Sequence, residues 1–417
     1  MNVLDRFRKD FLYYFAGIII PGLINAVSIP VLKNLLGDAS FGKYSLYFSS
    51  YTLIAGSLVG WLCQSIIRFK AQHSEPNFFF GKIIRLSLLI TGVFSIASFF
   101  MVWYWGSSVL LSLLFSLALV SGGLQNIMIS VSQANFLARI TLFSESLRTL
   151  LYFISGVLLL TWSLNFFMEK LFIAVLLSYT VSLFLLIYKN KIPVSTIIQP
   201  RPSAEIFDLK KILVYGFPLA LWFSCAYLIT FIDKPYVAKS FGHAVQGNYQ
   251  AIYDFIYRGA TIVIAPILTA SFPLMTHAFE HQSKTQLNKF LKKLLLIETG
   301  ALIFAIIAYC LGGYRLLSYI LKLPAERSYF WVGLFILLSA FIWQLGMLLH
   351  KPLEFQKKTR LMLFNNLLAF MVTYILVLAV YYLKLDYRYY ALGVLAGSVV
   401  YALLSFVHLK KYLRSFH

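Results

Sequence analysis

The chain carries one motif twice, reading PVLKNLLGDASFGKY over residues 30–44 and PYVAKSFGHAVQGNY over residues 235–249. Both copies follow the pattern P-x6-G-x4-G-x-Y, and every matching position is offset by 205 residues, about half of the 417-residue chain. The glycines can adopt the positive φ angles that a tight turn requires, and Tyr is typical of the membrane interface. The motif therefore predicts a turn that re-enters the bilayer, present once in each of two similar halves.

The composition excludes an ordinary soluble protein. Hydrophobic residues make up 60% of the chain and charged residues 12%, whereas soluble domains have about 45–50% and about 25%. A helix needs about 20 mostly apolar residues to cross a bilayer. By that criterion we predict twelve membrane spans, at residues 11–35, 42–67, 83–105, 108–132, 144–163, 168–188, 212–232, 248–273, 288–311, 329–350, 361–383 and 389–409.

Six predicted spans separate the two motif copies, so both halves insert with the same polarity. We therefore expect an all-α integral membrane protein whose twelve helices form two parallel six-helix lobes. The Pro- and Lys-containing connection near the midpoint is typical of a linker. The predicted division is an N-terminal lobe at residues 1–190, a cytoplasmic linker at 191–211 and a C-terminal lobe at 212–417.

The positive charge predicts the orientation of the chain in the membrane. The 36 Lys and Arg residues outnumber 15 Asp and Glu, for a net charge of +21. With the N-terminus in the cytoplasm, 25 of the basic residues lie on the inner side and 10 on the outer side, which the positive-inside rule favours. We expect a multi-pass protein of a bacterial inner membrane with both termini cytoplasmic, and the charge gives no reason to expect a nucleic-acid partner.

The sequence contains no pattern typical of an enzyme or a metalloprotein. We find no P-loop, HExxH, GxSxG or dinucleotide-binding fingerprint. The three cysteines, Cys63, Cys225 and Cys310, are far apart in apolar segments and predict neither a disulfide framework nor a metal site. We therefore expect a protein without catalytic residues, cofactor or metal.

Charged residues inside apolar spans are the main candidates for a functional site, because burying a charge in lipid is costly. Arg258 falls near the middle of the eighth predicted span, and Asp254 precedes it by one helical turn. One interpretation is an internal ion pair that helps the helix insert. The other is a cationic site that meets phosphate bidentately, and the two are compatible.

Weaker candidates lie elsewhere in the chain. Asp233 and Lys234 end the seventh predicted span and are expected to form an interfacial pair at its outer end. Glu298 is either a proton-titratable carboxylate or a structural partner for a neighbouring base, and Asn25 bonds either a sugar or another helix. Lys33 is a further candidate cation. Other polar or aromatic candidates are an interfacial pair, Glu145 and Arg148, and three deep tryptophans, Trp61, Trp222 and Trp343.

One segment resembles a known family. It has an acidic-basic pair, then G-x-Y at the start of a helix, then prolines, and it is similar to the seventh-to-eighth helix segment of the polysaccharide flippases of the MOP superfamily (Wzx-type O-antigen and exopolysaccharide flippases). The residues that carry the resemblance are Ile232, Asp233, Lys234, Gly242, Gly247, Tyr249, Arg258, Pro266 and Pro273.

The resemblance implies a MATE/MOP-like transporter that flips an undecaprenyl-pyrophosphate-linked oligosaccharide, such as an O-antigen repeat unit, to the periplasmic leaflet by alternating access. Its substrate-binding residues would be Arg258, Lys234, Asp233, Lys33 and Asn25, with Asp254 and Glu298 serving in coupling or ion pairing. Its partners would be the lipid-linked oligosaccharide, membrane lipids, a polysaccharide polymerase and a chain-length regulator, in a lipopolysaccharide or related polysaccharide pathway.

Two other functions remain open on the sequence. A small-molecule or drug antiporter has the same two-lobe plan, but the first four predicted spans lack the interior acid of multidrug exporters. A membrane-embedded polymerase or glycosyltransferase is equally hydrophobic but typically carries a long periplasmic loop, whereas the longest predicted loop, at residues 189–211, is basic and internal.

Overall fold

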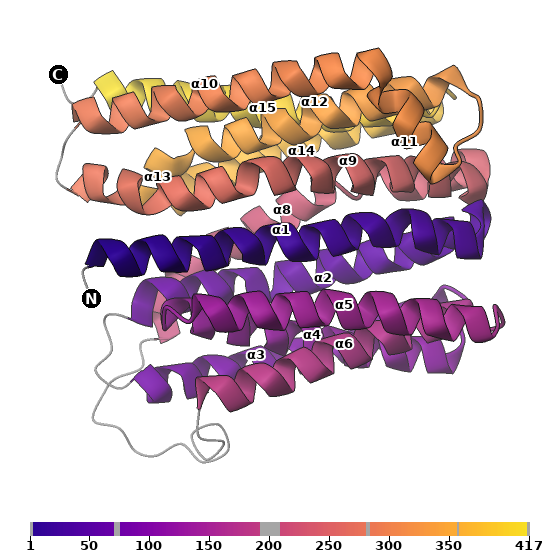
Figure 1. The fold of residues 1–417 in the computed structure, drawn as a ribbon, viewed down its shortest axis with the longest axis horizontal. Coiled ribbons are helices and arrows are strands. Elements are labelled where there is room, and N and C mark those ends of the chain that lie inside the picture. The colour runs from indigo at the N-terminus through magenta and orange to yellow at the C-terminus, as the bar shows by residue number, and fades with distance from the viewer. Residues whose placement is uncertain (1–2, 71–75, 192–208, 281–283, 357, 415–417) are drawn as a thin grey trace. The chain divides into compact units, whose positions relative to one another are not determined.

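The computed structural model describes residues 3–70, 76–191, 209–280, 284–356 and 358–414, and every element within them is helical (Figure 1). Helices suit a lipid environment because they satisfy their own backbone hydrogen bonds. The helices are α1 (Val3–Leu36), α2 (Asp38–Phe69), α3 (Pro76–Tyr104), α4 (Val109–Ala134), α5 (Ala138–Trp162), α6 (Phe167–Asn190), α8 (Leu209–Ile229), α9 (Asp233–Glu280), α10 (Lys284–Ala308), a π-helix η2 (Tyr309–Gly313), α11 (Tyr314–Leu321), α12 (Arg327–Leu349), α13 (Lys351–Phe355), α14 (Thr359–Tyr382) and α15 (Arg388–Arg414).

Eleven segments of the described chain are long and apolar enough to cross a membrane. One of them, Leu209–Ala265, is 57 residues long and contains α8 together with the first part of α9, whereas a single crossing needs about 20 residues. The predicted all-α membrane fold is confirmed, and the count of twelve spans stays a prediction.

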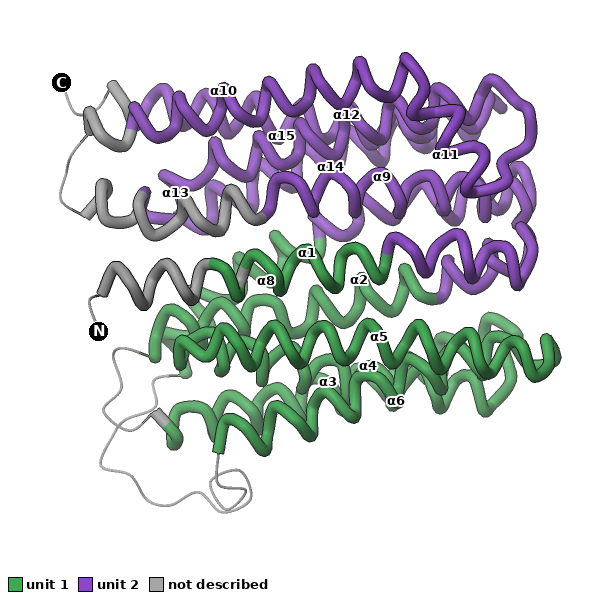
Figure 2. Tube along the Cα trace, in the orientation of Figure 1, with its two compact units in different colours: residues 1–25, 48–224 green, residues 26–47, 225–417 purple. Residues whose placement is uncertain are grey.

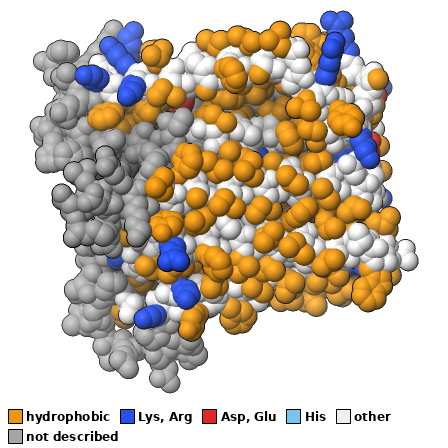
Figure 3. Space-filling view, in the orientation of Figure 1, with side chains coloured by type: hydrophobic (Ala, Val, Ile, Leu, Met, Phe, Trp, Pro, Cys, Tyr) orange, Lys and Arg blue, Asp and Glu red, His pale blue; other side chains and the backbone are white. Residues whose placement is uncertain are grey.

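The surface of the helices matches a lipid solvent. Large hydrophobic side chains are exposed along them, including Phe304 on α10 and Leu158 on α5. On the face seen in Figure 3, hydrophobic side chains cover the middle of the helices, and Lys and Arg lie toward their ends. In water such a surface would aggregate, whereas in a bilayer it faces acyl chains.

The chain forms two compact units (Figure 2). Unit 1 comprises Met1–Asn25 and Phe48–Ser224, and unit 2 comprises Ala26–Tyr47 and Cys225–His417. The boundaries fall within α1, α2 and α8, so the short segment around the first motif copy belongs with the second half of the chain. The predicted lobes at residues 1–190 and 212–417, divided in chain order, stay a prediction.

Close helix packing within each unit depends on small residues. In unit 1, α4 packs against α3 and α6; in unit 2, α15 packs against α12 and α14. A Cβ added to Gly346 of α12 would lie 2.8 Å from the Tyr401 ring, and one added to Gly397 would lie 2.0 Å from the Thr373 hydroxyl. Glycine lets neighbouring helices approach closely where lipid supplies no hydrophobic force between them.

Both copies of the repeated motif place their first glycine in a left-handed conformation, as the sequence predicts. Gly37 has a φ of 75° and separates α1 from α2, and Gly242 has a φ of 82° and bends α9. The eighth helix does not begin at residue 248, because the chain is helical from Asp233 up to the Gly242 bend as well as after it. The seven residues that precede each of these glycines, 30–36 and 235–241, are therefore helical and do not form a loop.

The second glycines bring the two copies together within unit 2. A Cβ on Gly42 would lie 2.0 Å from the carbonyl oxygen of His243, and a Cβ on Gly247 would lie 2.1 Å from the carbonyl oxygen of Asp38. Asp38 and His243 are themselves equivalent positions of the repeat, so the contact is reciprocal. Asn248 also donates a hydrogen bond of 2.9 Å to the Asp38 carboxylate. The repeat therefore forms a backbone-to-backbone junction that admits only glycine.

Replacing Gly247 with alanine tests this junction. The added methyl group would overlap a backbone carbonyl, which cannot move away as a flexible side chain can, so we expect a loss of about 1–3 kcal/mol in stability. Thermal unfolding of the detergent-purified protein measures the change. Gly259→Ala on the same helix is the control, because a Cβ added there would have nothing within 4 Å; equal stability of the two variants would contradict the junction.

Candidate functional site

A polar stripe runs along α9 beyond its bend at Gly242. Its residues recur at intervals of three or four positions and so lie on one face of the helix. In a helix that crosses lipid, such a stripe marks a face turned toward other protein groups or a polar path. The stripe consists of Gln246, Tyr249, Gln250, Tyr253, Asp254, Tyr257 and Arg258.

Asp233 lies beside this stripe at a break in the helical backbone. Helix α8 ends at Ile229, three residues form turns, and α9 begins at Asp233, where the helix dipole favours a negative charge. The Asp233 side chain is fully buried. One carboxylate oxygen accepts a hydrogen bond from the Tyr249 hydroxyl, and the other has no hydrogen-bond partner among the described residues.

Lys234 is also buried, with its ammonium nitrogen 4.4 Å from the centre of the Tyr253 ring. It lies within electrostatic reach of Asp254, Asp233 and Arg258. The helix continues for nine residues from Asp233 before Gly242, which is about 13 Å at 1.5 Å per residue. The position of the Asp233 and Lys234 pair at the membrane interface stays a prediction.

Asp254 and Arg258 are both half-buried on the stripe. Asp254 accepts a 2.8 Å hydrogen bond from the Gln250 amide. Among the described residues no ion pair joins Asp254 to Arg258, so the predicted internal pair is absent from this structure. Arg258 thus presents a guanidinium group that is not neutralised by the acid one turn before it.

Lys33 is not on the stripe but lies at the repeat junction, where its partner Asp38 also accepts a hydrogen bond from Asn248. Its side chain is 2% exposed, and its ammonium group is 2.7 Å from the Asp38 carboxylate. It also donates a 2.6 Å hydrogen bond to the carbonyl of Leu321 at the end of α11. These contacts give Lys33 a structural part in the turn between α1 and α2.

The two remaining candidates lie on other helices. Glu298 of α10 is 1% exposed, and neither carboxylate oxygen has a hydrogen-bond partner among the described residues. A buried carboxylate without a partner is costly when charged, which fits a group that binds a proton. Asn25 is half-buried on α1, at the end of the first segment of unit 1, and is not part of the stripe.

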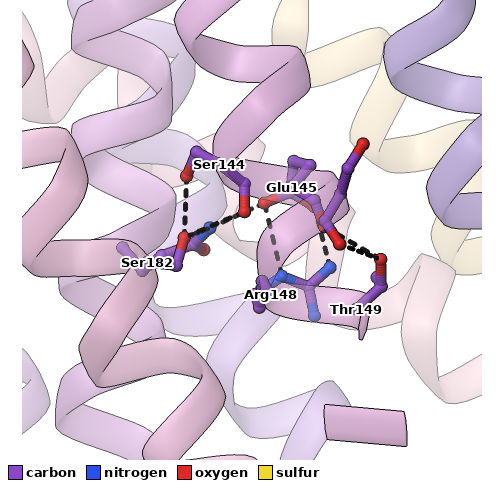
Figure 4. Close-up of polar contacts among 7 residues, drawn as sticks. Ser144, Glu145, Arg148, Thr149 and Ser182 are labelled. Carbon is purple, nitrogen blue, oxygen red and sulfur yellow. Dashed lines mark hydrogen bonds and ion pairs between the residues drawn. The ribbon is translucent and has the colours of Figure 1, made fainter. Parts of the chain in front are cut away.

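Unit 1 contains a polar cluster on α4, α5 and α6 (Figure 4). Arg148 donates hydrogen bonds of 2.7 and 3.3 Å to the two carboxylate oxygens of Glu145. Its guanidinium carbon lies 4.9 Å from the centre of the Tyr179 ring. Gln125 donates a 2.6 Å hydrogen bond to Glu145 and a 3.3 Å bond to Ser182. The charges are therefore paired and further supported by neutral polar groups.

Helix α5 begins at Ala138 and not at residue 144, and the position of Glu145 and Arg148 at the membrane interface stays a prediction. The pair lies two to three turns inside the helix.

The deep tryptophans Trp61, Trp222 and Trp343 are all less than 10% exposed. Trp343 stacks on Tyr401, and their burial leaves no ring face open to a sugar in this structure.

Comparison with known sequences identifies the family. The sequence profile of a family described as polysaccharide biosynthesis protein matches residues 7–279, which is well over half of the chain. The chain belongs to this family. No curated protein sequence matches it closely. The family match includes the stripe of α9 and the Glu145 and Arg148 cluster.

Solved structures establish the fold. A MOP superfamily transporter from Pyrococcus furiosus, described as having a binding pocket of reversed polarity that suggests a different function, superposes with a TM-score of 0.73 at 15% identity, covering 98% of this chain and 96% of that one. The outward-facing conformation of a multidrug resistance MATE transporter superposes with a TM-score of 0.71 at 15% identity. A MATE protein in complex with MaL6 superposes with a TM-score of 0.68 at 17% identity. In both comparisons the match covers 98% of this chain and 96% of the other. This polysaccharide biosynthesis family member therefore has the MATE/MOP fold, as the sequence resemblance implies.

The cluster in unit 1 gives a stability prediction. In the variant Arg148→Met the Glu145 carboxylate would remain in the span without its cation, and we expect a loss of about 3 kcal/mol. Thermal unfolding in detergent measures it. The double variant Glu145→Gln, Arg148→Met should recover most of the loss because no charge is left unpaired. Arg139→Met, at an exposed position of the same helix, is the control, and a loss no greater than in this control would contradict the prediction.

Proposed function

We propose that this protein is a flippase that carries an undecaprenyl-pyrophosphate-linked oligosaccharide, an O-antigen or related repeat unit, from the cytoplasmic to the periplasmic leaflet of a bacterial inner membrane by alternating access. Membership in the polysaccharide biosynthesis family supports the pathway, and the MATE/MOP fold supports transport and not catalysis. The polar stripe of α9, with Arg258 on it and Lys234 beside it, is the observation that carries the proposal.

The stripe has the chemistry that a sugar-pyrophosphate headgroup needs. Arg258 presents donors in a planar fork that matches two phosphate oxygens, and the buried Lys234 adds a second positive charge. The hydroxyl of Tyr257, which is half-buried on the stripe, can donate to or accept from a sugar hydroxyl. The prenyl tail would remain in the lipid, where the exposed hydrophobic surface of the helices meets it.

Because the sequence contains no P-loop, the energy for transport would come from a gradient or from the imbalance of the substrate itself. Glu298 is the candidate for coupling to protons, since its buried carboxylate has no partner in the described part of the chain. Asp254, half-buried beside Arg258, is the second candidate. A carboxylate that gains and loses a proton would alternate between a neutral form that tolerates burial and a charged form that does not.

A small-molecule antiporter is the second candidate function, because structures of multidrug MATE transporters share the fold. The two functions make opposite predictions for a deletion strain. Loss of a flippase removes surface polysaccharide while lipid-linked repeat units accumulate facing the cytoplasm. Loss of an antiporter changes drug sensitivity while the cell envelope stays unaltered.

Replacing Arg258 with alanine tests the proposed flippase. Losing the charged hydrogen bonds to pyrophosphate would cost about 1.5–3 kcal/mol, so we expect surface polysaccharide to fall by about tenfold or more. The measurement is the amount of surface polysaccharide per cell. An immunoblot of the membrane fraction checks that the variant and the unmodified protein are present at equal levels. Arg258→Lys should retain part of the activity because it keeps the charge but loses the fork geometry.

Lys239→Gln is the matched control, since Lys239 is an exposed cation on the same helix. It should export polysaccharide normally. Full export by Arg258→Ala at normal protein level would remove Arg258 from the proposed site.

The proposed orientation predicts which residues an impermeant thiol reagent reaches in intact cells. In a variant without the three native cysteines, a cysteine replacing the exposed Lys384 should react from outside, and one replacing the exposed Lys358 should react only after the membrane is permeabilised. The measurement is labelling with a fluorescent maleimide. The reverse pattern would contradict the cytoplasmic position of both termini.

A further inference from the structure

An open hollow of about 1040 Å³ lies in unit 2 between α11 and the start of α12. It is outside the polar stripe of α9, and no part of the proposed transport path uses it. Three cations and three aromatic side chains line it: Arg315, Lys322, Arg327, Tyr314, Tyr319 and Phe330. By the predicted orientation, these residues lie at the outer face of the membrane.

The three cations give the hollow a net positive charge. Arg315, Lys322 and Arg327 are exposed, and none of them forms an ion pair with a described residue. Glu326 is the one acid among the described residues of the lining, and one of its carboxylate oxygens accepts a 2.6 Å hydrogen bond from the Tyr387 hydroxyl. Burial and this hydrogen bond raise the pKa of Tyr387, so the phenol stays protonated and continues to donate.

Aromatic rings form the other part of the lining. Tyr314 and Phe330 pack edge to face with their centres 5.3 Å apart, which holds both rings in place. Tyr319 is 83% exposed, so its ring is accessible to a ligand. A Tyr ring offers an apolar face and a polar hydroxyl, which together match the C–H face and the hydroxyls of a sugar ring.

The walls of the hollow are anchored to the rest of unit 2. Leu317 and Leu321 form the buried face of α11, and Lys33 bonds the carbonyl of Leu321. Helix α11 follows the π-helix η2, which shifts the register of the chain between α10 and α11; π-helical turns of this kind are frequent at functional sites. The predicted ninth span ends at residue 311, whereas the chain stays helical beyond it.

We propose that this hollow binds an anionic saccharide, a sugar carrying a carboxylate or phosphate group. The unpaired cations would meet the anion, and the Tyr319 and Phe330 rings would pack on the sugar. The volume suits such a ligand, because small-molecule sites are typically about 300–1000 Å³. The site is distinct from the α9 stripe and does not depend on flippase activity.

The test measures binding to the purified full-length protein in nanodiscs of phosphatidylcholine. The probe is a hyaluronan tetrasaccharide, which carries glucuronate, and the comparison is chitotetraose, a neutral tetrasaccharide that shares the N-acetylglucosamine unit. We expect the acidic probe to bind with a Kd of about 1 mM or tighter, and the neutral one at least about tenfold more weakly. Saturation-transfer NMR of the sugar protons and calorimetry measure both.

Variants assign the binding to the hollow. The triple variant Arg315→Gln, Lys322→Gln, Arg327→Gln should weaken binding of the acidic probe by about tenfold, because three charge contacts at the surface are lost and each contributes little. Tyr319→Leu should weaken binding of the acidic probe while leaving every charge in place. Lys384→Gln is the matched control, because Lys384 and Lys322 are both exposed lysines with positive φ after a helix end, but only Lys322 lines the hollow.

Three results would overturn the proposal. The first is equal binding of chitotetraose, and the second is unchanged binding by the triple variant. The third is loss of the tetrasaccharide signal when phosphatidylglycerol is added to the nanodiscs, which would assign the hollow to a lipid headgroup. Thermal unfolding checks that each variant is folded. If the triple variant does not fold, binding of the acidic probe to Tyr319→Leu still tests whether the hollow is the binding site. Polysaccharide export in cells is a separate readout, so failure of either proposal leaves the other testable.

Discussion

The bilayer supplies no water to hydrogen-bond groups inside it, and the rest of the structure follows from that constraint. The backbone meets it by being helical in every element of the described residues. Side chains meet it by pairing: Arg148 with Glu145, Lys33 with Asp38, and the Tyr249 hydroxyl with the carboxylate of Asp233. Among the described residues, Arg258, which has no ion pair, and Glu298, whose carboxylate has no hydrogen-bond partner, are exceptions. Such groups inside a membrane protein are candidates for function.

Much of the fold could be predicted from the sequence because hydrophobic length is a strong local signal. Most predicted spans coincide with observed helices to within a few residues, and the motif glycines Gly37 and Gly242 have the positive φ that their spacing implies. Helices α5 and α9 begin earlier than predicted, and the residues that extend them include charged ones, Arg139 in α5 and Asp233, Lys234 and Lys239 in α9. A hydropathy window ends where such residues begin, whereas backbone hydrogen bonding continues through Asp233 and Ala138.

The candidate site is harder to predict because it depends on depth and on neighbours. Arg258 and Asp254 can be recognised as charges inside a span, but their lack of an ion pair depends on side-chain geometry that spacing does not fix. The tyrosines and glutamines of the stripe could have been found from their 3.6-residue period on α9. The partners of Lys33 and the cation-lined hollow bring together residues far apart in sequence, and no local pattern indicates such contacts.

The reciprocal contact of Gly42 with Gly247 also affects the order of events during synthesis. The first motif copy, in Ala26–Tyr47, is part of unit 2, whose other residues begin only at Cys225. At about 5–20 residues per second a ribosome needs roughly 10–40 s to make the 205 residues between the copies. For that interval the buried surface of the first copy has no partner from its own unit. The insertion machinery therefore holds an incomplete helix bundle until the second motif copy, at residues 235–249, is synthesised about halfway through translation.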